Sequence, residues 1–280
     1  MTEPFGARLR AALDTRGPLC VGIDPHSALL TGWGLGDDVD GLARFAGTVV
    51  EALADRVAVF KPQSAFFERF GSRGIAVLER TIADARSAGA LVILDAKRGD
   101  IGSTVEAYAQ AYLDASSPLF SDALTASPFL GYGSLEPLYA TAEKHGAGVF
   151  VLAFTSNPEG AEVQRALTPR GETVGAAILG SVARRNAGAE LLGSIGVVIG
   201  ATVADVPFDL SGLNGPVLAP GLGAQGGTPS GLRSVFGGAL RNVLPSTSRE
   251  LLRHGPDTAG LREAAKRSIE ECRAALEYLD

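Results

Sequence analysis

Residues 91–100, LVILDAKRGD, contain the pattern that decides the fold. An uninterrupted apolar run of strand length comes first, and an alternation of acidic and basic residues follows it directly. Continuous apolar runs are typical of parallel strands that are covered on both faces. In parallel α/β folds the chemistry lies at the C-terminal ends of the strands. The stretch therefore predicts a buried parallel strand that ends at a functional site.

Short apolar runs of the same kind recur along the whole chain. They are near-continuous rather than alternating, and they predict strands at residues 18–24, 57–61, 91–97, 122–127, 148–154, 196–202, 216–220 and 239–245. Amphipathic segments between them predict helices at residues 41–56, 73–88, 103–114, 134–145, 171–192 and 258–279.

Strands and helices thus alternate from one end of the chain to the other. No linker rich in Pro, Gly or Ser and no shift in composition divides the 280 residues. Eight strand–helix units in a row favour an α/β fold of one domain over residues 1–280, a single (β/α)8 TIM barrel. The alternative is an open, doubly wound parallel sheet, because a strand count taken from periodicity carries an error.

Composition excludes several classes of protein. With 46% hydrophobic and 20% charged residues, the chain can bury a sizeable core and is neither disordered nor fibrous. Its 25 Lys and Arg against 31 Asp and Glu give a net charge of −6, which disfavours broad binding to nucleic acid or anionic lipid. A local basic pocket for a small anion remains compatible with this charge.

The N-terminal segment and the longest uncharged stretch predict a protein of the cytoplasm. The first 17 residues carry Arg8, Arg10 and Asp14 and have no apolar core, so they predict an amphipathic helix rather than a signal peptide. The longest uncharged stretch, residues 210–232, is broken by Gly and Pro and does not predict a membrane span. Cys20 and Cys272 lie in apolar surroundings, which favours reduced core thiols over a disulfide.

Charged residues stand where the first three predicted strands end. Asp24 closes the first strand, Lys61 closes the second, and Asp95, Lys97 and Asp100 follow the third. Asp95 and Lys97 are two positions apart, so on an extended backbone they point to the same face. Such a cluster can be a structural layer of salt bridges, but alternating charges at one barrel mouth favour a site of proton-transfer chemistry.

A second group of residues predicts a phosphate site. The segment PGLGAQGGTPSG, residues 220–231, follows the seventh strand, and its glycines allow the backbone to approach an anion closely. SRELL, residues 248–252, predicts a short extra helix after the eighth strand, and Arg249 adds a bidentate donor. A glycine-rich loop alone is more often a turn, but this position is the recurrent phosphate site of such barrels.

The sequence predicts neither a metal site nor a nucleotide cofactor. His26, His145 and His254 are scattered without ligand spacing, so we expect them to be surface or loop residues. The nucleophile elbow, the Walker A loop and the dinucleotide-binding fingerprint are all missing.

The chain resembles the orotidine 5'-phosphate decarboxylase family. The resemblance rests on the Asp-x-Lys-x-x-Asp pattern at residues 95–100, supported in order by GIDP, FKPQSAFFERFG, TSNPEG, APGLGAQGG and SRELL, and it covers essentially the whole chain. The KPQ and TSNP elements are similar to the longer branch of the family. Asp-x-Lys-x-x-Asp by itself also occurs in sugar-phosphate relatives.

The resemblance implies decarboxylation of orotidine 5'-monophosphate to UMP and CO2, the last step of pyrimidine synthesis, without metal or organic cofactor. It implies that Lys97 is the proton donor to C6 and that Asp95 lies against the substrate carboxylate. Lys61 and Asp100 would complete a Lys-Asp-Lys-Asp network of catalytic residues. In the family the second aspartate of the motif reaches the partner's site, which implies a homodimer.

Residues that bind the rest of the substrate are also implied by the resemblance. Asp24 and Gln63 would contact the ribose, Gln225 the phosphate and pyrimidine region, and Arg249 the phosphate. The implied binding set is Asp24, Gln63, Ile101, Thr104, Ser127, Pro220, Gln225 and Arg249. Asp100, Ile101 and Thr104 would serve the neighbouring subunit. For the pyrimidine amide Ser127 is the candidate, and a shift of register would transfer this role to Thr125.

Two other functions are compatible with the same fold. One is a metal-dependent phosphosugar enzyme, such as a hexulose-phosphate synthase, which works through an enediolate. The other is a nucleotide-binding barrel without catalytic activity, which the intact acid–base cluster disfavours.

Overall fold

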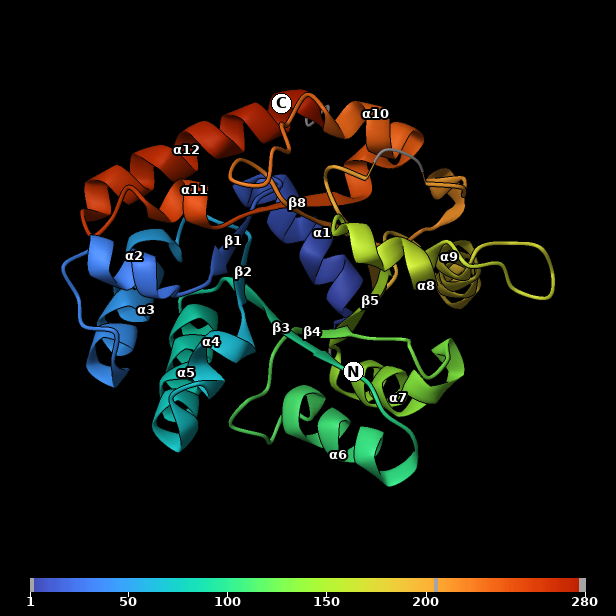
Figure 1. The fold of residues 1–280 in the computed structure, drawn as a ribbon, viewed down its shortest axis with the longest axis horizontal. Coiled ribbons are helices and arrows are strands. Elements are labelled where there is room, and N and C mark those ends of the chain that lie inside the picture. The colour runs from blue at the N-terminus through green and yellow to red at the C-terminus, as the bar shows by residue number, and fades with distance from the viewer. Residues whose placement is uncertain (1–2, 204–205, 277–280) are drawn as a thin grey trace.

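The computed structural model describes residues 3–203 and 206–276, and its strands form one closed parallel barrel. Each strand pairs with the next in chain order, and β8 pairs with β1 to close the ring (Figure 1). This confirms the predicted TIM barrel and contradicts the open doubly wound sheet. The strands are β1 Cys20–Ile23, β2 Val59–Pro62, β3 Leu91–Arg98, β4 Ala123–Ala126, β5 Gly148–Phe154, β6 Ile195–Ile199, β7 Val217–Pro220 and β8 Val243–Thr247.

Helices surround the barrel, and every predicted helix has a counterpart (Figure 1). The helices are α1 Phe5–Arg16, α2 Ser27–Gly32, α3 Val39–Leu53, α4 Ser64–Glu68, α5 Gly71–Ser87, α6 Gly102–Leu113, α7 Glu136–His145, α8 Ala161–Gln164, α9 Val174–Asn186, α10 Leu232–Phe236, α11 Arg249–Leu252 and α12 Thr258–Ala275. The short helices α2, α4, α8 and α10 were not predicted from the sequence pattern. The predicted helix 258–279 extends beyond the described residues.

The last strand lies further along the chain than predicted. Residues 239–242 belong to the 3-10 helix Gly237–Asn242, and β8 begins at Val243 and continues to Thr247. The predicted strand begins at Ala239 because this apolar residue precedes the apolar residues of β8, but Ala239 is buried as part of the 3-10 helix. Pro245 lacks an N–H and therefore suggests the end of a strand, yet it pairs with Ala219 inside β8.

Two connections are also less regular than predicted. In the described part of the chain between β6 and β7, the only helix is the 3-10 turn Leu210–Gly212. The helix predicted at residues 171–192 ends at Asn186, whose buried side chain amide donates to the backbone oxygens of Ile195 and Leu213. The bond to Ile195 ties the end of α9 to the start of β6. Leu192 lies outside the helix and packs in the same buried cluster as Phe5 and Phe150.

Helix α1 closes the N-terminal end of the barrel. Phe5, Leu9 and Leu13 recur every four residues, so they form one face of the helix, and all three are fully buried. They pack in one cluster with barrel residues such as Phe150 and Leu244. The N-terminal end of the barrel interior is thus filled, and the opposite end, where the strands have their C-termini, is open for a site.

Both cysteines are free and buried, as predicted. Burial raises the pKa of each thiol to about 12, so neither is ionised at neutral pH. Among the helices of residues 3–203 and 206–276, none is both long and apolar enough to cross a bilayer.

Candidate active site

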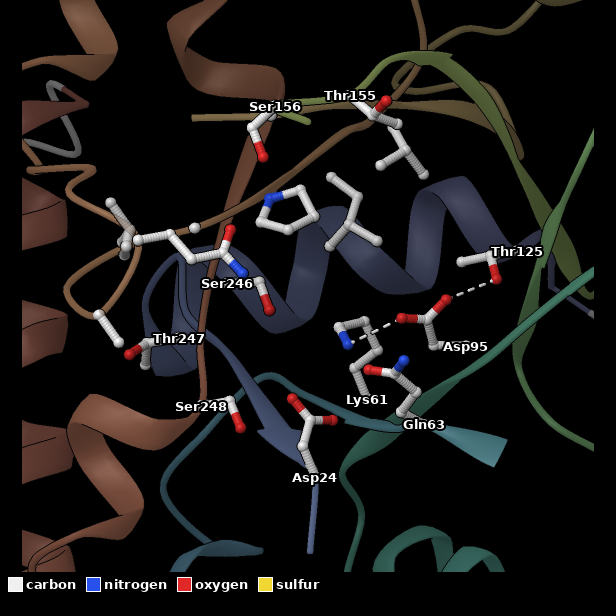
Figure 2. A pocket seen from close by; sticks show the side chains of 18 of the residues that line it. Asp24, Lys61, Gln63, Asp95, Thr125, Thr155, Ser156, Ser246, Thr247 and Ser248 are labelled. Carbon is white, nitrogen blue, oxygen red and sulfur yellow. Dashed lines mark hydrogen bonds and ion pairs between the residues drawn. The ribbon is translucent and has the colours of Figure 1, made fainter. Parts of the chain in front are cut away.

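A cavity of about 450 Å³ opens at the C-terminal ends of the strands. Its wall contains side chains from every part of the barrel, several of which Figure 2 shows pointing into the same space. Predicted site residues form a large share of the lining: Asp24, Lys61, Gln63, Asp95, Lys97, Pro220, Gln225 and Arg249. The structure thus brings together residues that lie as much as 225 positions apart in the sequence, Asp24 and Arg249 being the extremes.

Asp95 lies between two lysines in the floor of this cavity. Lys61 Nζ donates to Asp95 Oδ2 at 3.1 Å, and Lys97 Nζ donates to Asp95 Oδ1 at 2.6 Å. The Thr125 hydroxyl donates to the same Oδ1 at 2.8 Å (Figure 2). Lys61 and Asp95 are nearly inaccessible, whereas 45% of the Lys97 side chain is exposed. Lys97 is therefore the charged member of the group that can meet a bound molecule directly.

Burial and charge act in opposite directions on this group. Burial alone would raise the pKa of Asp95, but the ammonium groups of Lys61 and Lys97 and the hydrogen bonds outweigh it and hold that pKa well below its usual value. For Lys61, burial alone would lower the pKa, and the nearby Asp95 and Asp24 raise it above its usual value. The buried pair therefore stays fully ionised at neutral pH.

A bulge at the end of β3 orients Lys97. Leu94 pairs with Leu124 of β4 and Arg98 with Ala126, so four steps along β3 match two steps along β4. Within the bulge Lys97 has a φ of +49°, which is sterically costly for a residue with a Cβ. Its N–H donates to the Thr125 hydroxyl at 3.0 Å, so the same threonine holds both the backbone of Lys97 and the carboxylate of Asp95.

The opposite wall of the cavity contains the predicted phosphate region. The loop after β7 folds back on itself, because the N–H of Gly227 donates to the oxygen of Gly221 at 3.0 Å and the N–H of Gly223 to the oxygen of Gly227 at 2.9 Å. Gly221 and Gly223 have φ values of +112° and +74°, which side chains disfavour. Arg249 opens the four-residue helix α11 and is exposed at the rim. The predicted short helix is thus present and adjoins the cavity.

Between these two regions lie polar atoms that have no partner within the described chain. Asp24 Oδ1 and Ser248 Oγ are buried and accept or donate no hydrogen bond among the described residues. Both side chains point into the cavity in Figure 2. Buried polar atoms are rarely left unpaired, so these two atoms indicate where hydroxyl groups of a ligand would bind.

His26 lies in the loop between β1 and α2, as expected, but it also lines the cavity, which the sequence did not predict. It is half-buried and its ring contacts that of Phe66, with centroids 4.3 Å apart. Partial burial, together with Arg249 and Arg69, lowers the pKa of His26 against the opposing effect of Asp24. We therefore expect a neutral imidazole at this wall.

Four predicted site residues lie outside the lining of this cavity. Asp100 accepts from the N–H of Ile101 at 2.8 Å, and both Ile101 and Thr104 are exposed. Ser127 lies behind the bulge, where its N–H donates to the oxygen of Arg98 at 2.9 Å. Of the two candidates after β4, Thr125 is the one that lines the cavity.

Comparison with known sequences identifies the family of the chain. The sequence profile of the orotidine 5'-phosphate decarboxylase / HUMPS family matches residues 17–263. This chain belongs to that family.

Relatives in the family match over nearly the full length. Orotidine 5'-phosphate decarboxylase of Streptomyces coelicolor is 66% identical over 275 residues, which cover 98% of this chain and 99% of the relative. The enzyme of the same name from Salinispora arenicola is 64% identical over 274 residues, with 98% and 99% covered. A crystal structure from Streptomyces avermitilis, named for the same activity, has a TM-score of 0.97 at 65% identity and covers 99% of this chain and 97% of that one.

Some lining residues of this family member were not predicted individually from the sequence. Thr155, Ser156 and Asn157 follow β5, Thr247 ends β8, and Ser248 follows it. The TSNP and SR elements mark these positions in the sequence, but hydroxyl and amide side chains are common in any loop and carry no specific signal by themselves. No cluster of three or more His, Cys, Asp or Glu residues suited to a metal ion occurs within residues 3–203 and 206–276.

Proposed function

We propose that this protein decarboxylates orotidine 5'-monophosphate to UMP and CO2 in pyrimidine synthesis. The observation that carries the proposal is the Lys61–Asp95–Lys97 arrangement, in which a buried carboxylate is held between two ammonium groups at 3.1 and 2.6 Å. The names of the near-full-length relatives support the same reaction.

The reaction explains why these charges are needed. Loss of CO2 leaves an electron pair at C6 of the pyrimidine, and no carbonyl is placed to delocalise it simply. Catalysis then depends on preorganised charges that stabilise the carbanionic transition state more than the substrate. We propose that the Lys97 ammonium stabilises this charge and then delivers its proton to C6. Asp95 would lie against the departing carboxylate, and Lys61 would hold Asp95 in place.

The remaining groups suit the rest of the nucleotide. The unpaired Asp24 Oδ1 supports a role in binding ribose hydroxyls, and Gln63 lines the cavity beside it. Arg249, Gln225 and the loop that follows Pro220 would bind the phosphate, and this loop would close over the ring. Binding energy from the phosphate would position a ring that lies several bonds away from it.

The pyrimidine amide has two candidate partners. Thr125 lines the cavity but already donates to Asp95, whereas Ser127 lies outside the lining. Ser127 remains our proposal for the amide contact, and it requires the segment after β4 to move when substrate binds. Comparing KM in Ser127→Ala with KM in Thr125→Ser tests it. A raised KM in the first variant alone supports the proposal.

We also propose a homodimer in which Asp100, Ile101 and Thr104 complete the partner's site. Ile101 is 62% exposed, and Phe129 and Leu130 on the adjoining loop are 75% and 53% exposed. Large apolar side chains that cluster on one surface mark sites of protein association. A second copy of the chain would cover these residues and bring a fourth charge to each cavity.

We propose that residues 1–280 act as one functional domain in the cytoplasm. A closed barrel whose last helix packs beside its early helices offers no internal boundary in the described residues. The proposed substrate and product are phosphate monoesters, which do not cross a bilayer unaided, so the enzyme must work in the compartment where they are made.

One assay tests the activity against its rivals. Orotidine 5'-monophosphate should lose its absorbance and yield UMP in metal-free buffer that contains EDTA. Activity that disappears with EDTA and returns with a divalent cation would favour the phosphosugar type of chemistry instead. Binding of UMP without turnover would favour a nucleotide-binding barrel that lacks catalytic activity.

A further inference from the structure

Arg98, the residue that follows Lys97, connects the bulge of β3 to two helices. Its Nη2 forms an ion pair with Glu68 at the end of α4 and donates to the Tyr112 hydroxyl of α6 at 3.4 Å. The guanidinium carbon lies 5.6 and 5.8 Å from the ring centroids of Tyr108 and Tyr112. Only 26% of the side chain is exposed. The arginine is therefore held by a built set of contacts rather than solvated at the surface.

Other bonds of Arg98 hold the backbone on both sides of Lys97. Its Nη1 donates to the carbonyl oxygen of Ala96, the residue before Lys97, at 3.2 Å. Its own carbonyl oxygen accepts from the N–H of Ser127 at 2.9 Å. A glycine follows Arg98, and a Cβ at Gly99 would lie 2.2 Å from the Ser127 oxygen. The chain is thus packed tightly against the segment after β4.

Lys97 needs such support because its backbone conformation is unfavourable. A lysine at φ +49° persists only when the surrounding structure determines it. The Thr125 hydroxyl holds the peptide group before Lys97 by its N–H, and Arg98 Nη1 holds the same peptide group by the Ala96 oxygen, so two side chains together fix its orientation. Glu68, which anchors Arg98, is itself fixed by a hydrogen bond from the buried Ser64 hydroxyl at 2.6 Å. A continuous series of contacts therefore runs from α4 to the Lys97 backbone.

We propose that Arg98, anchored by Glu68, is a positioning residue that sets where the Lys97 ammonium stands in the cavity. Arg98 does not belong to the cavity lining, so it acts through Lys97 and not on the substrate. The inference rests on the proposed function, because it assumes that Lys97 reacts with the substrate. Without the bond to Ala96 and the anchor on α4, the bulge would relax toward ordinary φ values and carry the ammonium away from Asp95.

The test compares steady-state kinetics of Arg98→Met and Arg98→Lys on orotidine 5'-monophosphate. Misplacing a reacting group by about 1 Å can lower the rate of the chemical step about 100-fold. Arg98→Met should therefore lower kcat by about 10- to 100-fold. KM and the Kd for UMP should stay within about threefold, because the binding groups are untouched. Arg98→Lys should recover part of kcat by pairing with Glu68. Arg86→Met is the matched control, since Arg86 also stacks on an aromatic ring, Phe120, and pairs with an acid outside the site.

Three results would overturn the inference. The first is a kcat of Arg98→Met within about twofold of wild type, and the second is a loss of UMP affinity as large as the loss in kcat. The third is an equal fall of kcat in Arg86→Met, which would show a general effect of stability. If Arg98→Met does not fold, Glu68→Gln carries the test, with an expected fall in kcat of about 3- to 10-fold at unchanged KM. An inactive wild type would refute the proposed function instead, before any variant is compared.

Discussion

Lys61 Nζ lies 3.1 Å from Asp95 Oδ2, and this contact joins two nearly inaccessible side chains that are 34 positions apart in the sequence. The other carboxylate oxygen accepts from both Lys97 and Thr125, so both oxygens of Asp95 are engaged in hydrogen bonds. The buried ion pair thus fixes the orientation of the carboxylate. The more exposed Lys97 donates to this fixed carboxylate at 2.6 Å.

Asp95→Asn should destabilise the protein strongly at pH 7 and less at pH 3. The pKa of Asp95 is lower in the folded than in the unfolded protein, so at pH values above the ordinary carboxyl pKa its charge stabilises the native state. This contribution is lost as the pH falls from the ordinary carboxyl pKa toward the folded-state pKa. Removing one charge of a buried pair costs about 3 to 5 kcal/mol. The difference in free energy of unfolding between wild type and variant should therefore narrow below about pH 4. Urea unfolding between pH 3 and pH 7 measures it.

Asp55→Asn provides the control for that series. Asp55 is 68% exposed and its carboxylate lies 3.6 Å from Arg56 Nε. The free energy of unfolding of Asp55→Asn should therefore stay within about 0.5 kcal/mol of wild type at every pH of the series. If the difference in free energy of unfolding between wild type and Asp95→Asn does not change with pH, packing and not charge accounts for the lost stability.

Lys97→Ala should abolish turnover while the barrel stays folded. The side chain is 45% exposed, so its removal leaves no large cavity in the core. Loss of both the stabilising charge and the proton donor should reduce the rate by about 10⁴-fold or more. Single-turnover formation of UMP measures this, and binding of UMP shows that the site is intact. Lys144→Ala, on the exposed last turn of α7, should leave the rate unchanged. A Lys97→Ala rate within about tenfold of wild type would remove Lys97 from the mechanism.

The sequence pattern predicts the barrel and much of its charged floor for a clear physical reason. Parallel strands covered on both faces need continuous apolar runs, and a charge at the end of such a run has to lie at the mouth. Asp24, Lys61 and Asp95 could be located in this way. The bulge at Lys97 could not, because it arises from the mismatch in register between β3 and β4, and the sequence of one strand does not reveal its partner's register.

Other features could not be predicted because tertiary contacts create them. Arg98 looks like an ordinary exposed charge in the sequence, yet Glu68 and Tyr112 hold it half-buried. His26 has no neighbours in the sequence that suggest its contact with Phe66. The start of β8 is obscured by the buried Ala239 of a 3-10 helix. In each case the local pattern is compatible with several structures, and contacts between distant residues select one.

Arg249→Ala should raise KM far more than it lowers kcat. Charge-assisted hydrogen bonds to a phosphate far from C6 contribute binding energy, and their loss should raise KM about 10- to 100-fold. Arg253→Ala is the matched control, because Arg253 is 61% exposed one turn later and pairs with Glu250. Orotidine, which lacks the phosphate, should be processed equally by wild type and Arg249→Ala. An unchanged KM for the nucleotide would exclude the phosphate contact.

Mixing two inactive variants tests whether Asp100 acts across a dimer interface. Lys97→Ala and Asp100→Ala should each be inactive alone, because each removes one member of every site. In a mixed dimer with Asp100 acting in trans, one site carries both lesions and the other carries neither. Random exchange makes about half of the dimers mixed, so about one quarter of the sites should regain activity. Native mass spectrometry verifies the mixed species, and refolding each variant alone provides the control. Mixed dimers without recovered activity would place Asp100 outside its partner's site.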